Sequence, residues 1–268
     1  MRVVGKPIAN VRGKIERKVL KDRRNLTEIK SLKKNNMNNK KKIIYGFIIT
    51  FVIFLSTILI CRQIHFKSNF IPNSFFEHLI MLLLSGVAIW IMNKELNFCI
   101  ALPNFKKLIK PFFIVVLITF LVNIPMNIIT VLMNGKVTTH PFLTNHSALQ
   151  IFLFVFLFAS ITEEILFRGF FQNSLKSLNK RGITILKCRF SFPVIISAIM
   201  FGLAHLTLIT AGVDYLFLIR IVLFTSILGI AAGYYQEKYE NNTSYAIIVH
   251  MGGNLFGILS AFLLNIQQ

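Results

Sequence analysis

The chain has 268 residues, of which 54 % are hydrophobic and 27 are phenylalanine, and it carries a formal net charge of +20. Its mean hydropathy is +0.65. This composition excludes an ordinary soluble domain, because a soluble domain of this length has far less apolar surface to bury. It predicts an all-α fold, a polytopic bundle of transmembrane helices.

Residues 1–42 form a basic N-terminal tail with fifteen Lys and Arg against three acidic residues, a net charge of +12. We expect this tail to stay in the cytoplasm and to contact the anionic headgroups of the lipid bilayer. A solvated tail is the simplest interpretation, although its apolar spacing also allows an amphipathic helix on the membrane. No aromatic side chains interleave with the basic ones, so we expect no nucleic acid partner.

Residues 43–268 form the predicted transmembrane domain. Apolar runs of about 18 residues or more are typical of membrane spans. The chain has seven such runs, or eight if the fourth breaks at an acidic pair: 43–60, 76–92, 112–133, 148–171, 192–209, 215–235 and 245–264. Two later Lys- and Arg-rich loops fall on the same side as the tail, which agrees with a cytoplasmic N-terminus.

The fourth run holds the only adjacent acidic pair in the chain, Glu163 and Glu164, followed by Arg168. A charged side chain within a bilayer costs about 2.5 to 3.5 kcal/mol and is therefore usually paired and functional. Glu164 and Arg168 are spaced to form an ion pair, and Glu163, rotated by about 100°, faces another partner. Alternatively, Ser160 and Glu163 form a capping box, the span ends near Ile161, and a cytosolic helix begins there.

Two later runs carry further polar side chains. His205 lies one turn after Phe201, and His250 lies one turn before Asn254. A lone histidine in an apolar helix is more often a hydrogen-bonded packing residue. Together with Glu163, however, these groups indicate a shared polar site, because isolated polar groups in a bilayer are costly. They suit hydrolysis, in which a carboxylate accepts a proton from water and donors stabilise an oxyanion.

Other polar residues are expected to have no catalytic role. Arg220 lies inside the sixth run, and we expect a structural pairing within the bundle, with Asp214 as one candidate partner. Glu77 and His78 lie at an outer boundary that water can reach. The remaining histidines and the cysteines lack metal-ligand spacing: His65, His140, His146, Cys61, Cys99 and Cys188.

The polar patterns are Glu163-Glu164-x-x-x-Arg168, Phe201-x-x-x-His205 and His250-x-x-x-Asn254. In this order they resemble the three motifs of the CPBP intramembrane proteases. That family includes the type II CAAX prenyl endopeptidases and bacterial Abi-type, bacteriocin-processing and self-immunity proteins. The resemblance covers roughly residues 148–265 and implies a catalytic core there.

The resemblance implies a role for each matched residue. Glu163 is the base that activates water, and His205 helps to hold that water. His250 and Asn254 are the oxyanion donors. The supporting residues are Glu164, Arg168 and Phe201.

The residues leave the cofactor open. Glu163, His205 and His250 could form a two-histidine, one-carboxylate site for a divalent metal such as Zn. No HExxH spacing supports a metal, and an amide beside His250 suits an oxyanion hole better. We therefore expect a metal-free glutamate mechanism without a cofactor.

These inferences predict an intramembrane endopeptidase that acts on a peptide or a membrane protein. Richness in Lys, Asn, Ile and Phe is typical of an A/T-rich bacterial genome, so we expect a multi-pass protein of a bacterial cell membrane. Peptide maturation or bacteriocin self-immunity is then favoured over cleavage of prenylated CAAX substrates. The alternative is a non-enzymatic membrane scaffold or immunity protein that retains the polar site.

Overall fold

A computed structural model describes residues 38–64, 66–136, 142 and 146–266, without the side chains of 257–258 and 260–266. The basic tail up to residue 37, His65 and His140 lie outside this part, so the predictions made for them stay predictions. Residues 39–268 form one compact unit.

Long helices make up most of the described residues, which confirms the predicted all-α membrane bundle. Six are long and apolar enough to cross a membrane. They are α2 (Asn39–Cys61), α3 (Asn73–Ile91), η1 with α4 (Phe105–Lys107 and Ile109–Asn134), the fourth span (Ala148–Gln172), α8 with η5 (Phe192–Ala204 and His205–Ala211) and α9 (Tyr215–Lys238).

The expected count of seven or eight spans exceeds these six. The difference falls on the last predicted span, 245–264, which coincides with helix α10 (Thr243–Ile266). Most side chains of α10 beyond residue 256 lie outside the described part. The eight-span alternative is wrong, because the fourth span does not break at the acidic pair.

The fourth span is one continuous helix built from four segments: α6 (Ala148–Gln150), η2 (Ile151–Ala159), α7 (Ser160–Glu164) and η3 (Ile165–Gln172). Ala159 and Ser160 have helical backbone angles, and no side chain caps α7. The capping box proposed at Ser160 is therefore wrong, and a real one forms at the start of α6, where Ser147 and Gln150 bond reciprocally. η2 and η3 are π-helical, a wider winding that is frequent at functional sites.

Helix α9 is the most buried of the six spans. Of its 18-residue apolar stretch, 61 % is buried inside the protein, against 11 to 39 % for the other five spans. It packs against α8, α10 and α4. Its small residues at 229 and 231–233 let neighbouring helices approach closely. Gly202 of α8 faces α9 in the same way, because an added Cβ would collide with Ser226.

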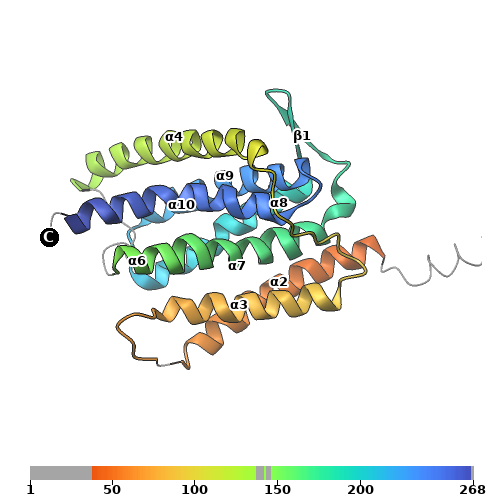
Figure 1. The fold of residues 1–268 in the computed structure, drawn as a ribbon, viewed down its shortest axis with the longest axis horizontal. Coiled ribbons are helices and arrows are strands. Elements are labelled where there is room, and N and C mark those ends of the chain that lie inside the picture. Colours follow the sequence, from red (N-terminus) through yellow and green to blue (C-terminus); the bar gives the residue numbers. More distant parts are fainter. Residues whose placement is uncertain (1–37, 65, 137–141, 143–145, 267–268) are drawn as a thin grey trace, which may run out of the picture. The chain divides into compact units, whose positions relative to one another are not determined.

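Helices α3, α7 and α10 run alongside one another, with α7 between the other two (Figure 1). α4 lies on the far side of α10. This arrangement places the middle of the fourth span between a helix that precedes it by about 80 residues and one that follows it by a similar distance. Polar side chains on all three can therefore meet.

One short hairpin, β1 (Gly182–Ile185) and β2 (Cys188–Ser191), occupies a segment expected to be a loop. Ile185 pairs with Cys188, so the turn is Leu186 and Lys187, both with positive φ (48° and 65°). Such turns normally carry Asn or Gly, so the sequence held no signal for this one. β2 runs directly into α8, whose first turn is capped by Ser191.

Candidate active site

The acidic pair on α7 is divided between two sets of partners. Glu164 accepts a hydrogen bond from Arg168 Nη1 at 3.0 Å, and the side chains of both are almost completely buried. The predicted ion pair within the fourth span is therefore present. The Arg168 guanidinium lies over the ring of Phe201, 4.4 Å from its centroid, and this stacking stabilises the buried cation.

Glu163 points to different partners, as the helical rotation between the two residues predicts. Its Oε1 lies 3.2 Å from Nε2 of His78 on α3. Its Oε2 lies 3.8 Å from Nε2 of His250 on α10, too far for a direct hydrogen bond. About 18 % of the Glu163 side chain is exposed, against 1 % for Glu164, so Glu163 is the carboxylate that a small molecule can reach.

His250 joins the two carboxylates. Its Nδ1 lies 2.9 Å from Glu164 Oε1, the same oxygen that receives Arg168. An ionised carboxylate only accepts hydrogen bonds, so Nδ1 is the donor. The other edge of the ring, with Nε2, is thereby directed toward Glu163.

His205 is the first residue after α8, where the helix tightens into η5. Its Nδ1 lies 2.9 Å from the carbonyl of Phe201, which can only accept, so Nε2 of the neutral ring is an acceptor. The Phe201 ring packs edge-on against both histidines, 5.1 Å from His205 and 5.4 Å from His250. His205 also interacts electrostatically with Glu163.

Asn254 lies one turn beyond His250 on α10 and reaches back to the fourth span. Its Nδ2 donates to Ser160 Oγ at 3.1 Å, and this hydroxyl donates in turn to the Val155 carbonyl at 3.4 Å. Ser160 is fully buried. It therefore fixes the orientation of the amide rather than capping a helix.

Residues 145–256 match the model of one protein family, described as Type II CAAX prenyl endopeptidase Rce1-like. This segment, which is less than half of the chain, is similar to the Rce1-like family. It contains all seven residues of the three polar patterns, and the family that it resembles is described as one of CAAX prenyl endopeptidases. The six apolar helices agree with a multi-pass membrane protein. No curated protein and no solved structure matches the chain significantly.

Sequence reasoning missed two residues of this cluster. Ser160 was noticed only as a cap. His78, expected at a water-exposed boundary without a function, instead contacts Glu163 and has only 18 % of its side chain exposed. No local spacing reveals a contact across 85 residues, and His78 lies outside the Rce1-like segment.

A metal site does not emerge from the described residues. Within them, no group of three or more His, Cys, Asp or Glu side chains is arranged to hold a metal ion. Glu163, His205 and His250 therefore do not form a ligand set in this arrangement.

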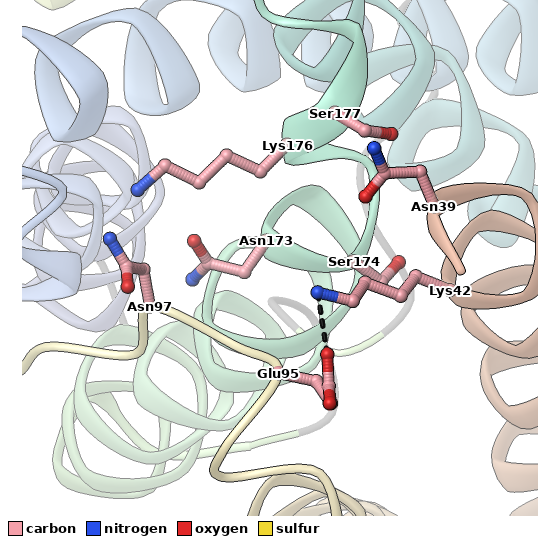
Figure 2. A pocket seen from close by; sticks show the side chains of 8 residues that line it. All are labelled: Asn39, Lys42, Glu95, Asn97, Asn173, Ser174, Lys176 and Ser177. Atoms are coloured by element: carbon pink, nitrogen blue, oxygen red, sulfur yellow. Dashed lines mark ion pairs between the residues drawn. The ribbon is translucent and has the colours of Figure 1, made fainter. Parts of the chain in front are cut away.

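A polar pocket of about 270 Å³ lies away from the acidic pair, at the end of the fourth span (Figure 2). Lys42 of α2 and Glu95 after α3 form an ion pair of 2.5 Å in it, and Asn173 and Lys176 line the opposite part. None of its lining residues is one of the Rce1-like candidates. The ion pair joins α2 to the segment that follows α3.

Arg220 stands apart from the cluster. It donates to Asn127 on α4, and its guanidinium lies 4.9 Å from the centroid of the Phe217 ring. Asp214, the suggested partner, interacts electrostatically with Arg220 and also caps the first turn of α9 by accepting from the Phe217 amide at 3.0 Å. The amide of Asn127 is thus a partner that the sequence did not predict.

Proposed function

We propose that the protein is an intramembrane endopeptidase that hydrolyses a peptide bond in a membrane-associated protein or peptide, with Glu163 as the general base. One observation carries this proposal. Glu163 is the more accessible member of the acidic pair and faces Nε2 of His250 at 3.8 Å, within an Rce1-like segment. A general base has to reach its water directly, and Glu164, sealed by Arg168, cannot do so.

The reaction follows from this arrangement. The Glu163 carboxylate takes a proton from water as the water oxygen attacks the peptide carbonyl carbon. The resulting tetrahedral oxyanion collapses, the carbon–nitrogen bond breaks, and the leaving nitrogen receives the proton held by Glu163. The products are a carboxylic acid and an amine, with no oxidant or cofactor needed.

His205 is assigned to hold the water. Its Nδ1 hydrogen is used by the Phe201 carbonyl, which leaves the Nε2 lone pair to accept from a water O–H. A water held in this way turns an oxygen lone pair toward the substrate. The contact with Phe201 also fixes the plane of the imidazole.

The oxyanion donors are assigned to Asn254 and His250. An amide nitrogen carries two hydrogens, and only one of those on Asn254 is used by Ser160. His250 is held through Nδ1 by Glu164, which turns its Nε2 edge to the space beside Glu163. As an oxyanion donor His250 has to be the imidazolium, which carries a hydrogen on Nε2 as well as on Nδ1. Donors placed before the reaction are effective because they need no reorganisation as charge develops.

The substrate class is proposed from the membrane setting. The basic tail favours a cytoplasmic N-terminus that rests on anionic headgroups. At about 1.5 Å of rise per residue from the cytoplasmic helix ends, Glu163 and His250 then lie in the inner half of the membrane. We assign the protein to a bacterial cell membrane and its substrate to unprenylated peptides, in peptide maturation or bacteriocin self-immunity. The family is named for prenyl endopeptidases, so prenylated peptides are the natural comparison.

The test uses purified protein in detergent and a panel of fluorogenic peptides with and without a farnesylated C-terminal cysteine. We expect wild type to cleave members of the panel and Glu163→Ala to lose about 10³-fold in kcat, as for removal of a general base. Glu240→Gln, which alters an exposed carboxylate after α9, is the matched control and should retain activity. Preference for farnesylated peptides would reverse the substrate assignment.

The rival function is a membrane scaffold or immunity protein that retains the cluster for stability. It predicts no cleavage by wild type, or equal cleavage by Glu163→Ala, together with a loss of thermal stability in that variant. A tag at each terminus tests the proposed topology. Seven spans place the C-terminus opposite the cytoplasmic N-terminus, and tags on the same side would contradict that count.

A further inference from the structure

Among the described residues, His78 is the one polar group in contact with Glu163 that comes from a helix before the Rce1-like segment. It lies in the second turn of α3, and its Nε2 is 3.2 Å from Glu163 Oε1. Glu163 is thus held from α3 on one oxygen, while its other oxygen faces α10. His78 thus adds a contact to Oε1 of Glu163 that comes from outside the three polar patterns.

The imidazole of His78 is itself fixed. Its Nδ1 lies 2.7 Å from the carbonyl of Ser74, one turn earlier on α3, and donates to it, because a carbonyl only accepts hydrogen bonds. The Glu163 carboxylate also only accepts, so the ring holds both partners as the imidazolium, with a hydrogen on each nitrogen. The ring also lies against Phe158 of the fourth span, with 6.4 Å between centroids. The contacts with Ser74 and Phe158 therefore fix the plane of the His78 ring independently of its contact with Glu163.

A carboxylate needs such a constraint to act as a base. The last torsion of a glutamate side chain is broad, so its two oxygens exchange positions readily unless one is held. A base must also reach its water within about 2.6 to 3.2 Å. Holding Oε1 on His78 leaves Oε2 as the oxygen directed to His250 and to the proposed water.

We propose that His78 is a positioning residue that holds the Glu163 carboxylate in the orientation needed for catalysis. This proposal rests on the proposed function of Glu163 as general base. In this role His78 does not contact the substrate, so replacing His78 should lower kcat and leave KM unchanged. The working site consequently extends beyond residues 145–256 and includes α3.

Two amide variants separate the two contacts of the ring. A glutamine amide nitrogen reaches roughly the place of Nε2 and can hold Glu163, whereas an asparagine amide reaches only the place of Nδ1, near Ser74. We expect kcat to fall about 10- to 100-fold in His78→Ala and His78→Asn, as for a misplaced catalytic group. His78→Gln should recover most of the activity, with KM constant throughout.

His146→Gln is the matched control, since His146 makes the same Nδ1 contact to a carbonyl four residues away, at 3.1 Å from Phe142. It should keep wild-type kcat. Activity of His78→Asn equal to that of His78→Gln, or a rise in KM alone, would overturn the positioning role. If Glu163→Ala is active, the proposed function fails instead, whatever the His78 variants do.

A second measurement needs no substrate. In nitrogen-15 histidine spectra of the detergent-solubilised protein, Glu163→Gln should shift the Nε2 signal of His78 and leave that of His146 in place. An unchanged His78 signal would show that the contact is absent and would remove the basis of the proposal even if no peptide is cleaved.

Discussion

His250 bonds to Glu164 through Nδ1 at 2.9 Å, while its Nε2 lies 3.8 Å from Glu163. One imidazole thus connects the buried ion pair of the fourth span to the proposed base. Besides neutralising two buried charges, the ion pair orients the His250 ring that faces the proposed reacting groups. Replacing Glu164 should therefore lower both the stability of the protein and its kcat.

Replacing Glu164 by Gln tests this connection. Arg168 is completely buried, so losing its counter-charge should lower the free energy of unfolding by about 3 to 5 kcal/mol. His250 loses its charged acceptor at the same time, so kcat should fall as well. Thermal unfolding in detergent and peptide cleavage measure the two effects.

The double variant Glu164→Leu with Arg168→Met supplies the control for stability. Removing both charges leaves no unpaired ion, so it should be less destabilised than either single variant. Strictly additive losses would contradict a direct coupling between the two side chains.

Asn254→Ala should lower kcat by about 10²- to 10³-fold, the usual effect of removing an oxyanion donor. Ser160→Ala should cost much less, because the amide loses only the group that orients it. Asn123→Ala is a suitable control, since this half-buried asparagine of α4 donates to Thr119 on its own helix at 2.9 Å. A full loss of activity in Ser160→Ala and none in Asn254→Ala would reverse the assignment.

Gly229→Ala probes the space around the ion pair. A Cβ at this position would lie 2.6 Å from Arg168 Nη2 and 3.1 Å from the Ala198 backbone. We expect a loss of about 1 to 3 kcal/mol in unfolding free energy from this overpacking. Gly86→Ala on α3, where a Cβ meets nothing within 4 Å, should be neutral or slightly stabilising. Equal melting temperatures for the two variants would count against tight packing at Arg168.

Chelators test the cofactor. Glu163, His205 and His250 are not arranged as ligands in the described part of the chain, so cleavage should continue in EDTA or phenanthroline. Activity that disappears with a chelator and returns with zinc would replace the glutamate mechanism with a metal-dependent one. Metal analysis of the active protein is the independent check.

Hydropathy predicted the spans well because a bilayer imposes a minimum apolar length. The expected runs 192–209 and 215–235 begin where α8 and α9 begin. The helical segment η1–α4 starts at Phe105, earlier than the expected run that begins at residue 112. Lys106 and Lys107 lower the mean hydropathy of its first turns, so these turns were not included in the predicted span. The π-helical winding of η2 and η3 could not be predicted, because the same apolar residues suit an α-helix.

The site was predictable where residues lie within one turn of each other. The pairing of Glu164 with Arg168 and the contact of Phe201 with His205 follow from helical spacing. The contacts of Glu163 with His78 and of Ser160 with Asn254 join distant parts of the chain. They depend on which helices are neighbours, and one sequence does not contain that information.

The order of the helices has a consequence for biosynthesis. The cluster takes His78 from α3, Glu163 from α7 and His250 from α10, so its contacts span nearly the whole membrane unit. A nascent chain that has inserted α3 and α7 still lacks the imidazole that α10 brings. Hydrolytic competence would therefore arise only after α10 has inserted, so a chain that has inserted α3 and α7 alone would not yet cut proteins around it.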